Sequence, residues 1–332
     1  MAKIDLNSSI KRIAVLTSGG DSPGMNPAIR SVVRASIYFG RRVFGIKHGY
    51  YGLIEDEVEE MKSNDVSDII NRGGTILKTS RCKRFFDKEG RAKAYKTLKK
   101  HRIDALVVIG GNGSFRGAEL LGKEFDIPII GIPGTIDNDL SGTDYTIGYD
   151  TALNNVVNAI DKIRDTASSH DRLFFVEVMG RDAGFIALRS GIASGAEAVL
   201  VPEIHTEYGS LKKYLKEEYQ NKKSSSIVLV AEGDDSGGAM MISNAIKHDF
   251  PEFNIRVTIL GHIQRGGAPT AFDRVMASEM GIAAVKGLLS GEKNVMVGVK
   301  NRKTVYVPLC KAEKHTKKLK PSLLETLSIL NV

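Results

Sequence analysis

Tryptophan is absent from this chain of 332 residues, and cysteine occurs only twice, at Cys82 and Cys310. Two cysteines in a chain of this length exclude a disulfide scaffold and are typical of a reducing compartment. No apolar run approaches the roughly 20 residues that a membrane span needs, and the N-terminus lacks an apolar signal segment. The sequence therefore predicts a cytoplasmic protein that is neither secreted nor membrane-spanning.

Proline is scarce and glycine is abundant, since the 34 glycines make up roughly 10% of the chain against about 7% in an average protein. Nine prolines and no glycine period exclude collagen-like and low-complexity chains. A hydrophobic share of 42% excludes a disordered chain, and the length fits two domains. We therefore expect many tight backbone turns between regular elements.

Acidic residues are outnumbered, at 39 against 47 Lys and Arg, which gives a net charge of +8. A basic balance suits nucleic acids, membrane surfaces or small anions. No zinc-finger, RNP or homeodomain pattern occurs, and the densest basic stretch, Lys311–Lys320, lacks aromatic residues and is predicted to be a solvated helix face. The expected partners are phosphorylated small molecules, with no nucleic acid and no membrane.

Short apolar runs alternate with amphipathic segments along most of the chain. The runs predicted as buried strands are Arg12–Thr17, Asp104–Ile109, Ile127–Ile132, Leu173–Val178, Ala198–Val201, Ile227–Ala231 and Val257–Leu260. Apolar runs without alternation are typical of parallel sheets covered on both faces. The predicted helices are Met25–Phe39, Ser114–Glu124, Tyr149–Asp165, Leu211–Gln220 and Ala239–Lys247. This order predicts an α/β protein with mainly parallel sheets, divided near residue 148.

Glycine-rich turns follow three of the predicted strands, at Gly19–Asp21, Gly110–Ser114 and Gly134–Asp139. Ligands bind at the carboxyl edge of an open α/β sheet, and glycine lets backbone N–H groups approach an anion. Three such loops therefore predict phosphate binding. The segment Gly111–Gly117 misses the dinucleotide fingerprint because its last glycine falls one place late, which disfavours a nicotinamide-dependent enzyme.

Asp137 and Asp139 stand within three residues of each other, in a turn after a predicted buried strand. Such a pair can hold a divalent metal, or one carboxylate can accept a proton while its neighbour supports it. A helix cap or an Asx turn is the structural alternative. The two phosphate-type loops nearby favour the chemical interpretation.

Arginines stand near strand ends in the second half of the chain, at Arg172, Arg181, Arg256 and Arg265. Together with His262 they could converge on a phosphate, because guanidinium forks match phosphate oxygens. Glu232, at the end of another predicted strand, could accept a hydrogen bond from a sugar hydroxyl or could cap a turn.

Together these segments resemble the ATP-dependent 6-phosphofructokinase family of bacterial type, over nearly the whole chain and in family order. The matching motifs are SGGDSPGMN (Ser18–Asn26), INRGGT (Ile70–Thr75), GGNGS (Gly110–Ser114), PGTIDND (Pro133–Asp139), MGR (Met179–Arg181) and GHIQRGG (Gly261–Gly267). The resemblance implies two Rossmann-like lobes, each a mainly parallel sheet covered by helices. Residues 1–147 plus about 263–312 would bind ATP, and residues 148–262 plus about 313–332 would bind fructose 6-phosphate.

The resemblance also implies transfer of the ATP γ-phosphate to the 1-hydroxyl of fructose 6-phosphate, with Mg²⁺, in glycolysis. Asp137 would be the general base, with Thr135, Asp139 and Arg181 as further catalytic residues. The implied ATP-binding residues are Gly20, Arg81, Cys82, Gly111, Asn112, Gly113 and Ser114. The implied substrate-binding residues are Thr135, Ile136, Asp137, Arg172, Met179, Gly180, Arg181, Glu232, Arg256, His262, Ile263, Gln264 and Arg265. Arg172 and Arg256 match residues that the family supplies from a neighbouring subunit, which implies a homotetramer with shared active sites.

The chain departs from the family pattern at Asn112, where relatives usually carry an Asp near the magnesium ion. The metal ligands implied here are Asn112 and Asp137, and loss of one charge should weaken the metal site. Pyrophosphate-using relatives carry Asp and Lys where this chain has Gly113 and Gly134, so ATP is favoured as the donor. The alternatives are a pyrophosphate-dependent phosphofructokinase and a weakly active regulatory paralogue.

An effector site for ADP or phosphoenolpyruvate is also implied by the resemblance. Its matching residues are Arg30, Arg34, Asp68, Arg164, Gly195, Ala196, Glu197 and Lys223. Ser63 and Asn221 stand where relatives often carry Arg and Lys. Because two cations are missing, we expect weaker binding of an anionic effector and blunted allostery.

Overall fold

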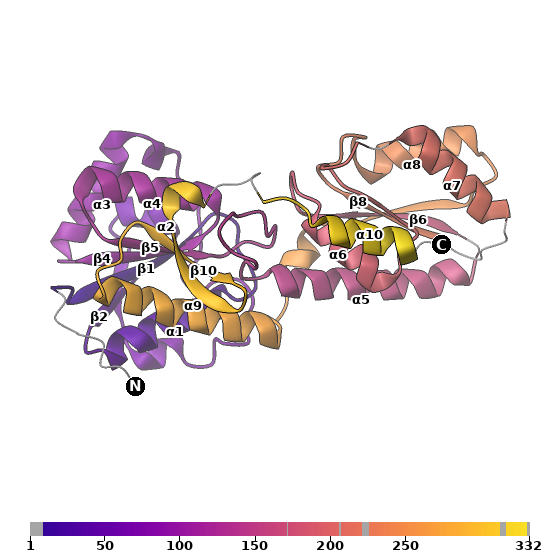
Figure 1. The fold of residues 1–332 in the computed structure, drawn as a ribbon. Helices are drawn as coiled ribbons and strands as arrows, with labels where there is room; N and C mark the ends of the chain where they lie inside the picture. Colours follow the sequence, from indigo (N-terminus) through magenta and orange to yellow (C-terminus); the bar gives the residue numbers. More distant parts are fainter. Residues whose placement is uncertain (1–8, 171, 206, 221–225, 313–316, 331–332) are drawn as a thin grey trace. The chain divides into compact units, whose positions relative to one another are not determined.

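The computed structural model describes residues 9–170, 172–205, 207–220, 226–312 and 317–330 (Figure 1). The described chain forms two compact units. Unit 1 takes its residues from Met1–Ile136, Leu140–Thr151 and Arg265–Thr316, and unit 2 from Asp137–Asp139, Ala152–Gln264 and Lys317–Val332. The chain thus passes between the units several times, whereas the sequence-based boundaries at 147, 262 and 312 stay a prediction.

Unit 1 is built on a seven-stranded sheet in the order β11-β10-β5-β4-β1-β2-β3. Its strands are β1 (Arg12–Ser18), β2 (Arg42–Ile46), β3 (Val58–Met61), β4 (Ala105–Gly110), β5 (Ile129–Pro133), β10 (Val295–Lys300) and β11 (Lys303–Pro308). The five central strands are parallel, and the edge strands β3 and β11 pair antiparallel with their neighbours. The central strands are almost wholly buried, as continuous apolar runs predict.

Helices cover both faces of this sheet (Figure 1). They are α1 (Met25–Tyr38), α2 (Gly49–Ile54), α3 (Lys88–Lys100), α4 (Asn112–Phe125) and α9 (Ala271–Leu289). Ile13 and Val15 of β1 pack into the core under α1 and α9, whereas Ala14 and Leu16 pack into the core under α3 and α4. The alternation of side chains along a strand therefore supplies two hydrophobic cores from one sheet.

Unit 2 is built on a smaller, wholly parallel sheet in the order β7-β8-β6-β9. Its strands are β6 (Leu173–Val178), β7 (Ala198–Leu200), β8 (Ser226–Ala231) and β9 (Ile255–Ile259). Its helices are α5 (Tyr149–Ser168, from Ala152 onward), α6 (Phe185–Ser194), α7 (Tyr208–Gln220), α8 (Gly238–Asp249) and α10 (Pro321–Leu330). In Figure 1, α7 and α8 cover one face of the sheet, and α5, α6 and α10 cover the other.

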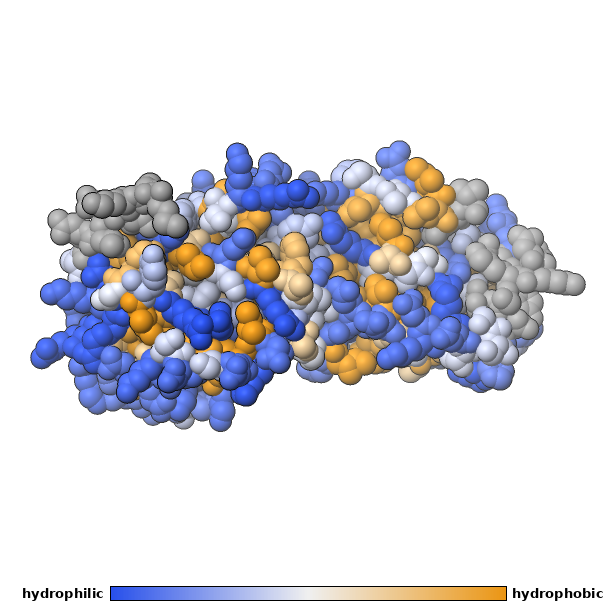
Figure 2. Space-filling model, turned by 90° about the horizontal axis from the view of Figure 1, so that it is seen from below, coloured by the Kyte–Doolittle hydropathy of each residue, from blue (hydrophilic) through white to orange (hydrophobic). Residues whose placement is uncertain are grey.

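The structure confirms the predicted strands and helices, with ends shifted by a few residues. The basic stretch Lys311–Lys320 corrects an expectation, because its described part is not a helix face. Lys311 ends a short 3-10 turn, α10 begins only at Pro321, and the Lys317 ammonium lies 5.3 Å from the centre of the Phe185 ring. In the face shown in Figure 2, apolar residues form small groups among hydrophilic ones. Among the described residues, no helix combines the length and apolar character that a membrane crossing requires.

Candidate active site

Three strands of unit 1 end side by side. Ser18 at the end of β1 pairs in register with Gly110 of β4, and Gly110 pairs with Pro133 of β5. The glycine-rich loops that follow therefore begin at one edge of the sheet, where open α/β sheets bind ligands. This register places Ser18 and Gly110 side by side although they are 92 residues apart in the sequence.

The first two loops approach each other so closely that only glycine fits between them. A Cβ atom on Gly110 would lie 2.4 Å from the Ser18 carbonyl oxygen and 2.7 Å from Ser114 Oγ. By contrast, a Cβ on Gly113 would meet nothing within 4 Å, and a Cβ on Gly111 only Thr135 Cβ at 3.7 Å. Gly111 is the N-cap of α4, so open space lies over backbone N–H groups at a helix N-terminus. This arrangement suits a phosphate group.

Arg265 lies against the first loop. Its Nη1 donates to the Asp21 carbonyl oxygen at 2.9 Å, and the same atom lies 3.1 Å from the position of a Cβ on Gly20. Arg81 is exposed, and half-buried Cys82 packs against the hydrophobic core under α3 and α4. The structure thus places Arg265 and Gly20 together, while Cys82 contributes to packing.

The carboxylates of Asp137 and Asp139 are buried, with 2% and 7% of each residue exposed. Asp137 Oδ2 lies 3.5 Å from Nε of Arg181, and both residues belong to unit 2. The backbone N–H of Arg181 donates to Glu232 Oε1 at 2.7 Å. Of the two alternatives for Glu232, the structure shows the turn contact. The buried carboxylate of Asp137 is thus held beside a guanidinium, which partly neutralises its charge.

A second group of predicted residues lies at the carboxyl edge of the unit 2 sheet. Met179 follows β6, Glu232 follows β8, and residues 261–264 follow β9. Gln264 is fully buried, and its Oε1 accepts a hydrogen bond from the Met179 backbone N–H at 3.1 Å. His262 and Ile263 are exposed. Gln264 therefore holds two of these loops together, while the side chains of His262 and Ile263 are exposed.

Arg172 and Arg256 stand at the opposite edge of the same sheet. Arg172 precedes β6, and Arg256 is the second residue of the neighbouring strand β9, where it pairs with Phe174. Along the six residues of β6, at about 3.3 Å per residue, Arg172 lies about 20 Å from the carboxyl end of the strand, after which Arg181 follows. The structure therefore places Arg172 and Arg256 toward the amino edge of the sheet, whereas Arg181 lies beyond its carboxyl edge.

The predicted effector residues fall into two groups, one in each unit. In unit 1, burial and the charge of neighbouring Arg34 lower the pKa of Arg30 on α1, and Asp68 is exposed. In unit 2, Arg164 pairs with Glu197 at 3.4 Å, and its Nη2 donates to the carbonyl oxygens of Ser194 and Gly195 at 2.9 and 2.8 Å. Ala196 beside them is buried. Lys223 and Asn221 lie outside the described residues.

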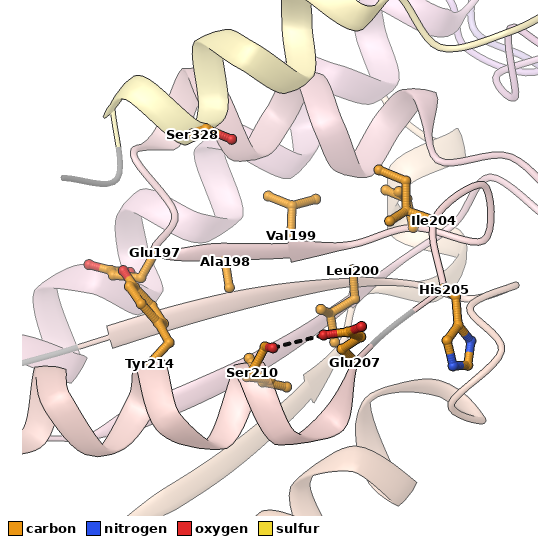
Figure 3. A pocket seen from close by; sticks show the side chains of 12 residues that line it. Glu197, Ala198, Val199, Leu200, Ile204, His205, Glu207, Ser210, Tyr214 and Ser328 are labelled. Carbon is orange, nitrogen blue, oxygen red and sulfur yellow. Dashed lines mark hydrogen bonds between the residues drawn. The ribbon is translucent and has the colours of Figure 1, made fainter.

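A cavity of about 380 Å³ lies in unit 2 along β7, the edge strand of the sheet, with walls from α7 and α10 (Figure 3). Val199 and Ile204 give it apolar walls, and Ser210 Oγ donates to Glu207 at 3.0 Å. Its lining contains two carboxylates, Glu197 and Glu207, which would repel a phosphate, so the cavity does not suit one. Of the predicted site residues, it includes Glu197.

Three residues near the first loops were missed by the sequence analysis: Thr146, Gly148 and Asp273. Thr146 Oγ1 donates to the Thr135 carbonyl oxygen at 2.6 Å, and Gly148 N donates to Asp273 Oδ1 at 2.9 Å. A sequence signal existed only for Asp273, because Thr270 and Asp273 have the spacing of a capping box at the start of α9. The hydrogen bonds of these residues join segments that are distant in the sequence, so no local sequence pattern indicates them.

Comparison with known proteins gives consistent results. The phosphofructokinase family model matches residues 12–288. The chain is 56% identical over 324 residues to ATP-dependent 6-phosphofructokinase 2 of Bacteroides thetaiotaomicron, covering 98% of this chain and 99% of that protein. Its structure is similar to that of phosphofructokinase from Saccharomyces cerevisiae, with a TM-score of 0.85 and 37% identity over 97% of this chain and 47% of that one. It is also similar in fold to pyrophosphate-dependent phosphofructokinase from Marinobacter aquaeolei, with a TM-score of 0.83 and 21% identity over 97% of this chain and 91% of that one.

Proposed function

The chain belongs to the phosphofructokinase family, and from that premise we propose that it phosphorylates the 1-hydroxyl of fructose 6-phosphate with ATP. The products are fructose 1,6-bisphosphate and ADP, and the reaction is a step of glycolysis in the cytoplasm. The observation that carries this function is the buried carboxylate of Asp137 beside Arg181, in the segment that follows β5 and its glycine-rich turn.

Phosphoryl transfer depends on alignment and charge neutralisation more than on covalent chemistry. The N-terminus of α4 and the loop N–H groups around Gly20 and Gly111 bind the ATP phosphates. Asp137 takes the proton from the sugar 1-hydroxyl, and Arg181 beside it stabilises negative charge. Thr135 and Asp139 support the same turn.

Mg²⁺ is the proposed cofactor, and the side-chain oxygen atoms of Asn112 and Asp137 are ligands of the type it prefers. Among the described residues, no group of three or more His, Cys, Asp or Glu side chains could enclose a metal. Magnesium in phosphotransferases needs only one or two protein oxygens, because substrate phosphates and water complete its shell. Asn112 and Asp137 would supply an amide and a carboxylate oxygen. When bound, the ion neutralises charge on the transferring phosphate.

The fructose 6-phosphate site is assigned to unit 2, at the edge that carries Met179, Gly180, Glu232, His262 and Gln264. Arg172 and Arg256 lie at the other edge of that sheet, so they serve the site of a neighbouring subunit. This supports a homotetramer with shared active sites. ADP or phosphoenolpyruvate is the proposed effector, bound by the groups around Arg30 and Arg164.

ATP is expected to be the phosphoryl donor, with kcat/KM at least about 100-fold higher than with pyrophosphate, a difference of roughly 2.7 kcal/mol. The structure supports this choice at Gly134, where a Cβ would lie 3.0 Å from Met25 Cε and 3.1 Å from Ile109 Cγ2, leaving little room for lysine. A coupled assay for fructose 1,6-bisphosphate compares the two donors. A preference for pyrophosphate would contradict the proposal, and no turnover with either donor would favour a regulatory paralogue.

Asn112→Asp is expected to lower the Mg²⁺ concentration needed for half-maximal activity about 10-fold, because a carboxylate binds the cation better than an amide. Asn112 is the first residue of α4 and is half-buried. Mg²⁺ titrations at saturating ATP and fructose 6-phosphate measure the change. Asn301→Asp, in the turn between β10 and β11, is the matched control and should leave the titration unchanged. An unchanged midpoint in Asn112→Asp would remove this residue from the metal site.

A further inference from the structure

The segment Thr146–Thr151 contacts the turn that leads to Asp137. Thr146 Oγ1 donates to the Thr135 carbonyl oxygen at 2.6 Å, and the Ile147 backbone N–H donates to the Pro133 carbonyl oxygen at 2.8 Å. Thr146 is fully buried. The turn after β5 is therefore held on one side by β4 and on the other by this segment, since Gly134 N also donates to Gly110 O at 2.9 Å.

The same segment is anchored at its other end by Asp273 of α9. Asp273 Oδ1 accepts from the Gly148 backbone N–H at 2.9 Å, and Oδ2 accepts from Thr151 N and Oγ1 at 2.8 and 2.6 Å. Asp273 is fully buried, and burial raises the pKa of its carboxyl to about 6. At neutral pH the carboxylate is ionised, and three hydrogen bonds compensate for its burial.

The side chain of Asp273 does not cap its own helix. The N-cap of α9 is Thr270, whose Oγ1 accepts from the Asp273 backbone N–H at 3.2 Å and donates to Asp150 at 2.7 Å. Capping therefore uses the backbone of Asp273 and leaves its carboxylate directed at Gly148 and Thr151. The Asp273 carboxylate therefore binds a segment outside its own helix.

Gly148 packs closely against the first glycine-rich loop. Its φ is +99°, and a Cβ there would lie 2.6 Å from Ser22 Cβ in the first phosphate loop. A Cβ on Gly24 would likewise lie 2.5 Å from Ile147 Cγ2. The segment is thus packed against the first loop while it is hydrogen-bonded to the turn after β5.

We propose that Asp273 and Thr146 are positioning residues for catalysis: Asp273 anchors the segment Thr146–Thr151, and Thr146 holds the turn that places Asp137. This inference rests on the proposed function, because it assigns Asp137 the role of base. It makes Asp273 of α9, 136 residues after Asp137 in the chain, part of the support of the reacting group.

Thr146→Val and Asp273→Asn test the proposal at pH 8, where Asp273 is ionised. Thr146→Val removes the hydroxyl and keeps the shape, and it should lower kcat at least about 10-fold, because small displacements of reacting groups cost up to about 100-fold. Asp273→Asn should lower kcat by about 10- to 100-fold, since an amide NH₂ would face N–H donors. KM for both substrates should change less than about 3-fold, because the binding loops stay in place.

Matched controls separate positioning from general destabilisation. Thr146→Ser restores the hydroxyl and should restore kcat to within about 3-fold of the unsubstituted enzyme. Asp104→Asn removes a carboxylate that accepts from the Lys11 and Arg12 backbone at 2.8 and 2.9 Å, at the amino ends of β1 and β4, and should leave kcat unchanged. If Asp273→Asn does not fold, Thr146→Val carries the test.

Amide hydrogen exchange in residues 134–139 measures the stability of the turn without an activity assay. Faster exchange there in Thr146→Val, with normal exchange in the rest of the sheet, is the expected result. Unchanged kcat and unchanged exchange would overturn the positioning role. An unsubstituted enzyme that is inactive with ATP and fructose 6-phosphate would refute the proposed function alone, because the exchange result would still decide the positioning role.

Discussion

Asp137→Asn is expected to lower kcat by about 100- to 10,000-fold, the range attributed to a general base. Asparagine keeps the size of the side chain, but it cannot take the proton of the sugar hydroxyl and it loses the ion pair with Arg181. KM for ATP should change little, because the phosphate loops after β1 and β4 are untouched. Steady-state kinetics with each substrate varied in turn measure both quantities.

Asp144→Asn is the matched control for this substitution. Asp144 lies seven residues further along, and its carboxylate accepts from the Asn301 backbone N–H at 2.8 Å, at the turn between β10 and β11. Its replacement should leave kcat within about 3-fold of the original value. A kcat for Asp137→Asn that stays in the same range would exclude Asp137 as the base.

Gly148→Ala is expected to lower the free energy of unfolding by about 2–5 kcal/mol. About 1–2 kcal/mol of this comes from the positive φ of +99°, and about 1–3 kcal/mol from crowding of the new methyl group against Ser22 Cβ, 2.6 Å away. Ser22 is fully buried, so it has little room to move. Thermal or urea unfolding of the purified proteins measures the difference.

Gly40→Ala separates the two contributions. Gly40 also has a positive φ, +69°, but a Cβ there would meet nothing within 4 Å. Its replacement should therefore cost only the conformational part, about 1–2 kcal/mol. Equal losses for the two variants would show that the Ser22 contact is relieved by movement of the first loop.

The interior of the fold follows closely from the sequence. Strands such as β4 and β8 are continuous apolar runs between polar or glycine boundaries, so their local pattern identifies them. The edge strands β3 and β11 carry charged and exposed residues. In α9, which packs against both α1 and the sheet, apolar residues such as Phe272, Val275 and Ile282 are exposed alongside the buried ones. These elements lack the periodicity that identifies an element, because tertiary contacts determine which of their residues are buried.

The residues of the candidate site could be named from the sequence for a related reason. Gly111 and Met179 follow apolar strands directly, Asp137 lies four residues after one, and the motifs around them are short and continuous. The sequence motif predicts that Gln264 binds substrate, which stays a prediction; only the packing shows that its buried amide accepts a hydrogen bond from the Met179 backbone. Asp273 was missed because its partners, Gly148 and Thr151, lie more than 120 residues away in the sequence.

The sequence by itself determined the α/β class, the main strands and helices, and the glycine-rich turns after the strands, because these depend on neighbours within a few positions. Only the tertiary structure decided which loops meet at one sheet edge, that Arg172 and Arg256 stand at the edge opposite Arg181, and that α9 supports the turn before Asp137. Strand register and long-range hydrogen bonds set these relations. They arise when distant segments pack together, and no local pattern records them.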